Sequence, residues 1–221
     1  MNKESIIVIE MTFVNAFLIK VNDGFILIDT GLGMHWEKLE SELLSAGCLP
    51  DNLKLVILTH GDFDHAGNCA RLQKKYKCRI AMHKEDSSMV ENGFVPKRIV
   101  RTLQGKIFIL IRRMFRKKFP FDKFKPDVYL TEGQSLNEYG FDAAVVHIPG
   151  HTKGSIGILT ADGNLFAGDT FTNRRKPETA TYIENQKDLE KSIARLKNMN
   201  IKTIYPGHGN PFEMEEIPGK R

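Results

Sequence analysis

The stretch Leu55-Val56-Ile57-Leu58-Thr59-His60-Gly61-Asp62-Phe63-Asp64-His65 joins an apolar run to four side chains that can bind a metal ion. Its first four residues predict a buried β-strand. His60, Asp62, Asp64 and His65 follow within six residues, so they lie on one turn where that strand ends. Such a cluster predicts a metal site at the edge of a sheet, and the alternative is a polar surface loop.

Three further ligand-type residues each stand beside glycine after a short β-rich run. They are His151 in Pro149-Gly150-His151-Thr152, Asp169 in Ala167-Gly168-Asp169-Thr170 and His208 in Pro206-Gly207-His208-Gly209. We expect each on a loop that leaves a strand, where glycine permits sharp turns and leaves room for a metal and a water. Together with the first cluster they make seven ligand candidates. One tetrahedral ion would not use so many, so the set favours two metals that share a carboxylate.

The order of these motifs resembles that of the metallo-β-lactamase superfamily, whose usual pattern is His-x-His-x-Asp-His followed by a separate His, Asp and His. The resemblance covers nearly the whole chain and implies an α/β (α+β) fold, a four-layer αββα sandwich of two mixed β-sheets. Strands in two batches with helices interspersed agree with such an architecture. Periodicity alone leaves a doubly wound α/β sheet as the competitor, but ligand loops from both halves of the chain must converge on one edge.

The resemblance also implies a role for each ligand candidate. The first metal is assigned to His60 and His151, the second to Asp64, His65 and His208, and Asp169 bridges the two. Asp29, in the run Asp29-Thr30-Gly31, looks like the family's aspartate that holds a ligand imidazole in orientation.

Asp62 departs from the family pattern, because it occupies the position of the second histidine. With Asp62 bound directly, which we favour over binding through a water, the first site has two imidazoles and two carboxylates. This harder, more anionic set moves the preference from zinc, otherwise favoured, toward iron or manganese. A carboxylate here also resembles the flavodiiron proteins, which use glutamate and carry a flavin-binding domain for which this chain has no length.

Length, composition and cysteine content predict one intracellular domain. With 221 residues and 41% apolar content, residues 1–221 suffice for one core. Met1 to Glu10 lacks a secretory signal, and no apolar run approaches the roughly 20 residues of a membrane helix. Cys48, Cys69 and Cys78 are odd in number and scattered, so we expect reduced thiols and a cytoplasmic location. Burial in the core is the expected fate of Cys69.

Residues 96–125 form a basic insertion between the metal motifs. From Lys97 to Lys125 eleven basic residues face the single acid Asp122, a local charge of +10 in a chain of net charge +5. Apolar residues at helical spacing predict an amphipathic helix: Ile99, Leu103, Ile107, Leu110 and Met114.

This insertion has three candidate roles. It is a lid over a substrate pocket, a surface for anionic membrane or acidic partners, or a packing face on the core or on a second subunit of a homodimer. Its position favours the lid or the interface. Nucleic acid ranks below a small-molecule substrate, because exposed aromatic residues do not interleave the basic ones.

The constellation predicts hydrolysis by a metal-activated water. Two ions roughly 3.5 to 4 Å apart bring the pKa of a shared water to about 7 and polarise the substrate, so no Ser or Cys nucleophile is needed. Asp64 is the catalytic candidate, which orients the attacking hydroxide and moves its proton. We expect a small ester, thioester or lactone substrate, as in the similar glyoxalase II-like and lactonase-like members. The alternatives are a di-iron protein that handles oxygen or nitric oxide, a phosphodiesterase or nuclease, and a non-catalytic binding protein.

Overall fold

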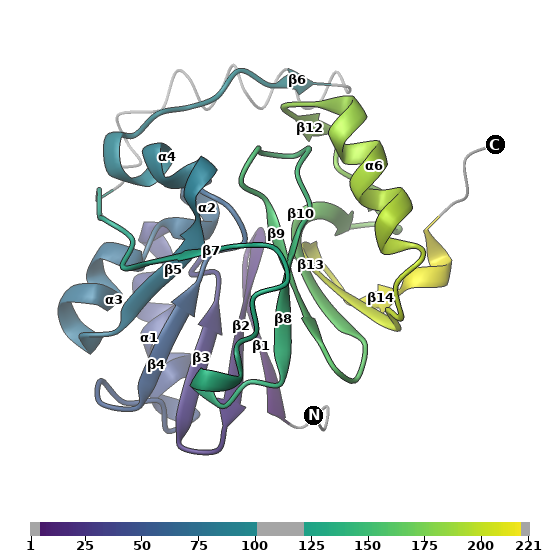
Figure 1. The fold of residues 1–221 in the computed structure, drawn as a ribbon. Helices are drawn as coiled ribbons and strands as arrows, with labels where there is room; N and C mark the ends of the chain where they lie inside the picture. Colours follow the sequence, from purple (N-terminus) through teal and green to yellow (C-terminus); the bar gives the residue numbers. More distant parts are fainter. Residues whose placement is uncertain (1–4, 101–121, 218–221) are drawn as a thin grey trace.

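Two β-sheets pack face to face in the computed structural model, which describes residues 5–100 and 122–217 (Figure 1). The first sheet has the order β1-β2-β3-β4-β5-β7. Antiparallel pairs join β1 to β2 and β2 to β3, whereas the later neighbours are parallel. The strand bounds are β1 Ile6–Met11, β2 Val14–Val21, β3 Gly24–Ile28, β4 Leu53–Ile57, β5 Arg79–His83 and β7 Val128–Leu130.

The second sheet is also mixed and has the order β14-β13-β10-β9-β8, with β11 paired to β10. Its β10 and β13 run parallel, and its other pairs are antiparallel. The strands are β8 Ala143–His147, β9 Ile156–Thr160, β10 Asn164–Asn173, β11 Glu178–Thr179, β13 Thr203–Gly209 and β14 Phe212–Glu213. A separate ribbon pairs β6 (Ile99–Val100) with β12 (Tyr182–Ile183).

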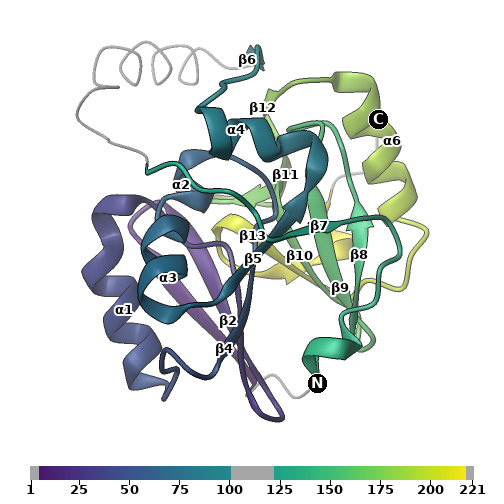
Figure 2. The same cartoon turned by 60° about the vertical axis from the view of Figure 1, so that its left-hand side comes forward.

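Helices cover the outer faces of both sheets. Figure 2 shows α1 (Trp36–Ser45) and α3 (Cys69–Tyr76) beside the first sheet and α6 (Gln186–Leu196) beside the second. Two short helices, α2 (Phe63–Ala66) and α4 (Ser87–Asn92), follow β4 and β5. The described part of the chain also contains the single 3-10 turns η2 Gly33–His35, η3 Lys84–Asp86, η5 Asn137–Tyr139 and η6 Met214–Glu216.

The core lies in three layers, which explains why the central strands are apolar on both faces. Leu18 of β2 packs with α1 and α3, whereas its neighbour Phe17 faces the second sheet, where its ring lies 5.1 Å from that of Phe166. The third layer joins the second sheet to α6 through Leu165 and Leu196. Side chains that alternate between two buried faces give continuous apolar runs rather than alternation with polar residues. The predicted αββα sandwich is confirmed.

Three details of the predicted elements were wrong. Asp169 and His208 lie within β10 and β13, not on loops beyond them, because a register shift at Gly168 lets the parallel pairing continue past the expected strand ends. The single helix expected from Ala66 to Tyr76 is interrupted: α2 ends at Ala66, and α3 begins at Cys69. Ile99, the first position of the predicted amphipathic helix, belongs to β6.

The rest of that predicted helix, with Leu103, Ile107, Leu110 and Met114, lies outside the described residues. The roles considered for residues 97–125 therefore stay predictions. Within residues 5–100 and 122–217, no helix is both long and apolar enough to cross a bilayer.

Candidate metal centre

All seven predicted ligands meet in one place, although they come from four segments of the chain. His60 follows β4, Asp62 to His65 surround the start of α2, His151 follows β8, and β10 and β13 supply the rest. Three overlapping groups have ligand atoms within 4.8 Å of one another: His60, Asp62 and His151; His60, His65 and Asp169; Asp64, His65 and His208. The structure therefore brings together the complete set that the sequence predicted.

Asp169 lies in the middle of this cluster. Its Oδ1 is 3.2 Å from Nε2 of His65, and its Oδ2 is 3.2 Å from Nε2 of His208. The same Oδ2 is 3.7 Å from Nε2 of His151, which belongs to the first ligand set. Asp64 completes the second set, with Oδ2 3.7 Å from His208 Nε2. A carboxylate so placed can touch ions on both sides.

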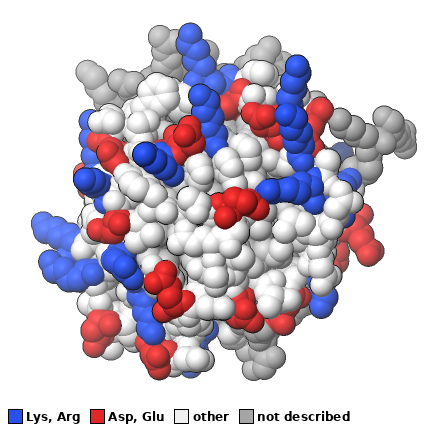
Figure 3. All heavy atoms as spheres, viewed as in Figure 1, with Lys and Arg blue, Asp and Glu red and all other residues white. Residues whose placement is uncertain are grey.

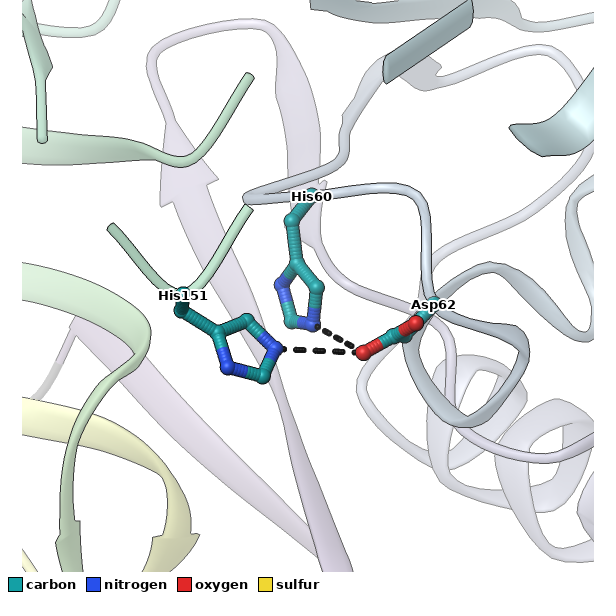
Figure 4. A group of neighbouring side chains, drawn as sticks. All are labelled: His60, Asp62 and His151. Atoms are coloured by element: carbon teal, nitrogen blue, oxygen red, sulfur yellow. Dashed lines mark hydrogen bonds and ion pairs between the residues drawn. The ribbon is translucent and has the colours of Figure 1, made fainter. Parts of the chain in front are cut away.

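Asp62 lies between the two imidazoles of the first set. Figure 4 shows His60 and His151 pointing at the same oxygen of Asp62, at 3.4 Å and 3.1 Å from their Nε2 atoms. Asp62 stands at the N-cap of α2, where aspartate usually accepts a backbone hydrogen bond, but its side chain makes none there. Its carboxylate is instead directed into the cluster.

Each histidine is held through Nδ1, which leaves Nε2 for the centre. His65 Nδ1 contacts Asp29 Oδ2 at 2.8 Å, His151 Nδ1 contacts the Tyr182 carbonyl at 2.6 Å, and His208 Nδ1 contacts the Phe13 carbonyl. His60 Nδ1 lies 3.0 Å from Thr59 Oγ1. A protonated Nδ1 bound to an oxygen fixes the tautomer in which Nε2 can bind a metal.

Asp29 organises this outer layer as the resemblance implied. Its Oδ1 accepts the Thr59 backbone N–H at 2.8 Å, and its Oδ2 accepts the Thr59 hydroxyl at 2.7 Å besides His65. Because the Thr59 hydroxyl donates to Asp29, its oxygen is free to accept from His60 Nδ1. One buried carboxylate thus orients an imidazole of each ligand set.

Buried charges shift the pKa values of the cluster. Burial opposes ionisation of Asp62, but the Arg98 guanidinium and the His151 and His60 imidazoles outweigh it and hold its pKa well below the usual range. Burial, followed by the charge of Arg98, lowers the pKa of His151. These directions favour an ionised Asp62 and a neutral His151, which are the protonation states that bind metals.

The second set shows the opposite shift in its histidines. Burial alone would lower the pKa of His65, but the carboxylates of Asp169 and Asp29 raise it well above its ordinary value. Burial would also lower the pKa of His208, but the carboxylate of Asp169 raises it. Asp169 itself is held well below its usual pKa by His208 and His65, although burial opposes this.

Orphaned polar atoms show that the donor set fits a metal ion. His60 Nε2, His65 Nε2 and Asp169 Oδ1 are fully buried and make no hydrogen bond to any described residue. Buried polar atoms normally have partners, so the gathering of such atoms at one point fits a metal ion that would bind them. Imidazole and carboxylate groups are the donors that zinc, iron and manganese accept.

Sequence reasoning missed two charged residues that hold the cluster, one by binding a ligand candidate and one by binding the loops that carry the candidates. Arg98, counted only among the basic residues of the insertion, binds the Asp62 carboxylate with both terminal nitrogens. Asp86, at the end of η3, binds Gly61, Thr152 and Gly154. The sequence contains no spacing signal for either residue, because both act through contacts between segments far apart in the chain. The Tyr182 carbonyl, which contacts His151, is a further contact between distant segments.

Lys and Arg side chains are intermixed with Asp and Glu over the described part of the face seen in Figure 3. The described residues on this face therefore form no broad patch of one sign. The excess of basic residues lies largely in the insertion, as the charge count indicated.

The Metallo-beta-lactamase superfamily profile matches residues 10–208. The chain therefore belongs to the metallo-β-lactamase superfamily. Human acyl-coenzyme A thioesterase MBLAC2 is 24% identical over 217 residues, which cover 92% of this chain and 75% of that protein. Hydroxyacylglutathione hydrolase GloC of Haemophilus influenzae is 31% identical over 123 residues, 54% of this chain and 50% of that protein.

Solved structures show the same fold. TTHA1623, crystallised in a di-iron-bound form, is 24% identical with a TM-score of 0.73, and the match covers 95% of this chain and 94% of that chain. Together, the superfamily match, the hydrolase relatives and the His/Asp groups identify the protein as a metal-dependent hydrolase of this superfamily.

Proposed function

We propose that the protein hydrolyses a small ester, thioester or lactone at a centre of divalent metal ions. The observation that carries this proposal is that the Nε2 atoms of four imidazoles converge on the carboxylates of Asp62, Asp64 and Asp169. The ligands would be His60, Asp62 and His151 for one ion, and Asp64, His65 and His208 for another, with Asp169 shared.

Zinc is the metal we favour, with iron or manganese as alternatives because Asp62 makes the first set more anionic. Bound ions would supply a water of lowered pKa and would polarise the substrate carbonyl. The chain supplies the proton transfer. Asp64 is suited to this role because its side chain is 24% exposed, more than Asp62 at 6% and Asp169 at 16%, so it can meet both solvent and substrate.

The names of two relatives support an acyl substrate. One relative is an acyl-coenzyme A thioesterase and the other a hydroxyacylglutathione hydrolase, and both names denote cleavage of an acyl group. We therefore rank thioesters first within the class, and small molecules ahead of the nucleic acids that a phosphodiesterase or nuclease would require.

A substrate panel tests this proposal. Zinc, manganese and iron forms would be assayed with short thioesters, aryl esters and lactones. We expect turnover with at least one metal, and its loss together with most bound metal in Asp169→Ala and His151→Ala. Asp142→Ala, which removes an exposed carboxylate elsewhere, is the matched control. Lack of hydrolysis with every metal would overturn the proposal.

A di-iron redox protein is the second candidate, favoured by the carboxylate of Asp62 between His60 and His151. Metal analysis of protein purified without added metal separates the two. Iron with an oxo-bridged absorption band, together with an inert ester panel, would support the redox candidate.

A further inference from the structure

Arg98 places a permanent positive charge inside the first ligand set. Its side chain is 1% exposed, and both terminal nitrogens bind the Asp62 carboxylate: Nη2 donates to Oδ1 at 2.9 Å, and Nη1 donates to Oδ2. A two-pronged guanidinium-carboxylate pair of this kind is strong and directional. Asp62 therefore already has a cation as its partner.

The backbone around Arg98 fixes this arrangement. Arg98 directly precedes β6, whose Ile99 and Val100 pair with Ile183 and Tyr182 of β12. The guanidinium carbon lies 4.7 Å from the centre of the Tyr182 ring, a favourable cation-π distance. The Tyr182 carbonyl also holds His151 Nδ1. One small ribbon thus positions both Arg98 and a histidine of the first set.

Arg98 uses the oxygen that a metal ion would need. Asp62 Oδ2 is the atom 3.4 Å from His60 Nε2 and 3.1 Å from His151 Nε2, and it is also the acceptor of Arg98 Nη1. A divalent ion among these atoms would share a buried carboxylate with a cation that does not lose its proton. Two positive charges repel strongly in such a poorly solvated place.

The second ligand set differs in this respect. Among the described residues, the arginine near it is Arg174, whose Nη2 lies 3.0 Å from the outer nitrogen, Nδ1, of His208. Arg174 therefore contacts the imidazole nitrogen that points away from the cluster, and the carboxylates of Asp64 and Asp169 can still bind an ion. The two halves of the cluster are unequal in charge, although their ligands are similar.

We propose that the Arg98 guanidinium competes with the ion of the first ligand set, so that the two sites fill unequally. The first ion binds at Asp64, His65, Asp169 and His208, and another binds at His60, Asp62 and His151 only when Arg98 leaves Asp62. Release is feasible because the Arg98 Nε is buried without a hydrogen-bond partner among the described residues. This inference rests on the proposed function, since it requires that the cluster binds divalent ions.

Cobalt titration of the metal-free, full-length protein tests the competition. Binding would be followed by calorimetry and by the visible absorption of Co²⁺, neither of which depends on turnover. We expect one tightly bound ion in the natural protein and two in Arg98→Ala, with the second ion bound at least about tenfold more tightly than in the natural protein. Arg175→Ala, which removes an exposed arginine, should titrate like the natural protein.

A second variant protects the test from a folding defect. Arg98→Met keeps much of the side chain's apolar length, and its far-ultraviolet dichroism should match that of the natural protein. If the charge is responsible, Arg98→Met also gains the second ion. Two equally tight ions in the natural protein, or titrations unchanged in both variants, would overturn the competition but leave the proposed hydrolase intact. No cobalt binding in any form would overturn both.

Discussion

Asp86 Oδ2 accepts the Thr152 hydroxyl at 2.7 Å and so ties the loop of the first metal motif to the loop of His151. The same oxygen accepts the Gly61 backbone N–H at 3.0 Å, and Oδ1 accepts that of Gly154 at 2.8 Å. Neither loop is fixed by strand pairing at these residues. Asp86 therefore helps to fix the distance between His60 and His151.

Asp86→Ala should destabilise the fold and loosen the metal centre. Three buried donors would lose a charged partner, and we expect a loss of about 3 kcal/mol in the free energy of unfolding. Urea unfolding of the metal-free protein measures this loss. Glu85→Ala, one residue away and exposed, is the control and should change stability by less than about 0.5 kcal/mol. Equal effects of the two substitutions would contradict the role given to Asp86.

Asp29→Asn should weaken metal binding without disturbing the backbone. Asp29 has a φ of 58°, in the left-handed region that asparagine also tolerates. The amide cannot accept hydrogen bonds from Thr59 and His65 at both positions, so His65 loses its orientation. Loss of such an outer partner typically costs about 10- to 100-fold in metal affinity. Competition with a chelator measures the metal affinity. Asp23→Asn is the control, because the Asp23 side chain is 85% exposed.

Gly207→Ala should expel metal while leaving the fold in place. An added Cβ would lie 2.6 Å from Asp169 Oδ1 and 2.6 Å from His65 Cε1, closer than real contacts allow. Asp169 must then move away from His65. We expect metal content by elemental analysis to fall below one ion per chain. Gly47→Ala is the control, because its φ of 80° adds backbone strain but no atom lies within 4 Å of the new Cβ. Full metal content in Gly207→Ala would contradict this assignment.

The ligands could be predicted from local patterns, whereas the sandwich followed from the family resemblance, because periodicity alone left a doubly wound sheet open. Buried strands give apolar runs, and His or Asp beside glycine marks the places where those strands approach the cluster. The ends of β10 and β13 were not predictable, because pairing between the two strands carries them through Asp169 and His208. Arg98 and Asp86 were not predictable either. Arg98 binds Asp62, which lies 36 positions away in the sequence, and Asp86 binds Thr152, which lies 66 positions away.

The three cysteines should resist thiol reagents in the native protein. Cys48, Cys69 and Cys78 are free and buried in the layer between the first sheet and its helices. Burial raises the pKa of Cys48 and of Cys78 to about 12, and it raises that of Cys69 well above its ordinary value. Little thiolate forms at neutral pH, so reaction with a disulfide reagent should await unfolding in denaturant. Rapid labelling of the native, metal-loaded protein would show that this layer opens.

Metal binding should release protons, and the pKa shifts of the second ligand set give the direction. The raised pKa values of His65 and His208 favour the protonated imidazoles in the metal-free protein. A metal ion requires the neutral imidazole, so it displaces these protons and its affinity rises with pH. Calorimetry in two buffers of different ionisation enthalpy counts the protons. Heats that do not depend on the buffer would contradict the assignment of these two residues as ligands.

The same shifts predict the pH range in which this cluster stabilises the metal-free fold. The raised histidines contribute stability fully below a pH of about 6.5, and lose it as the pH rises through their folded pKa values. Asp169, whose folded pKa is depressed, contributes above about 3.8 and loses this contribution as the pH falls through the folded value. Urea midpoints of metal-free protein should therefore decline toward alkaline pH, and saturating metal should reverse the decline because the ion replaces the protons. His65→Ala, which removes a histidine whose pKa is raised well above its ordinary value, should flatten the alkaline limb of the metal-free curve. An equally steep limb in that variant would place the titrating group elsewhere.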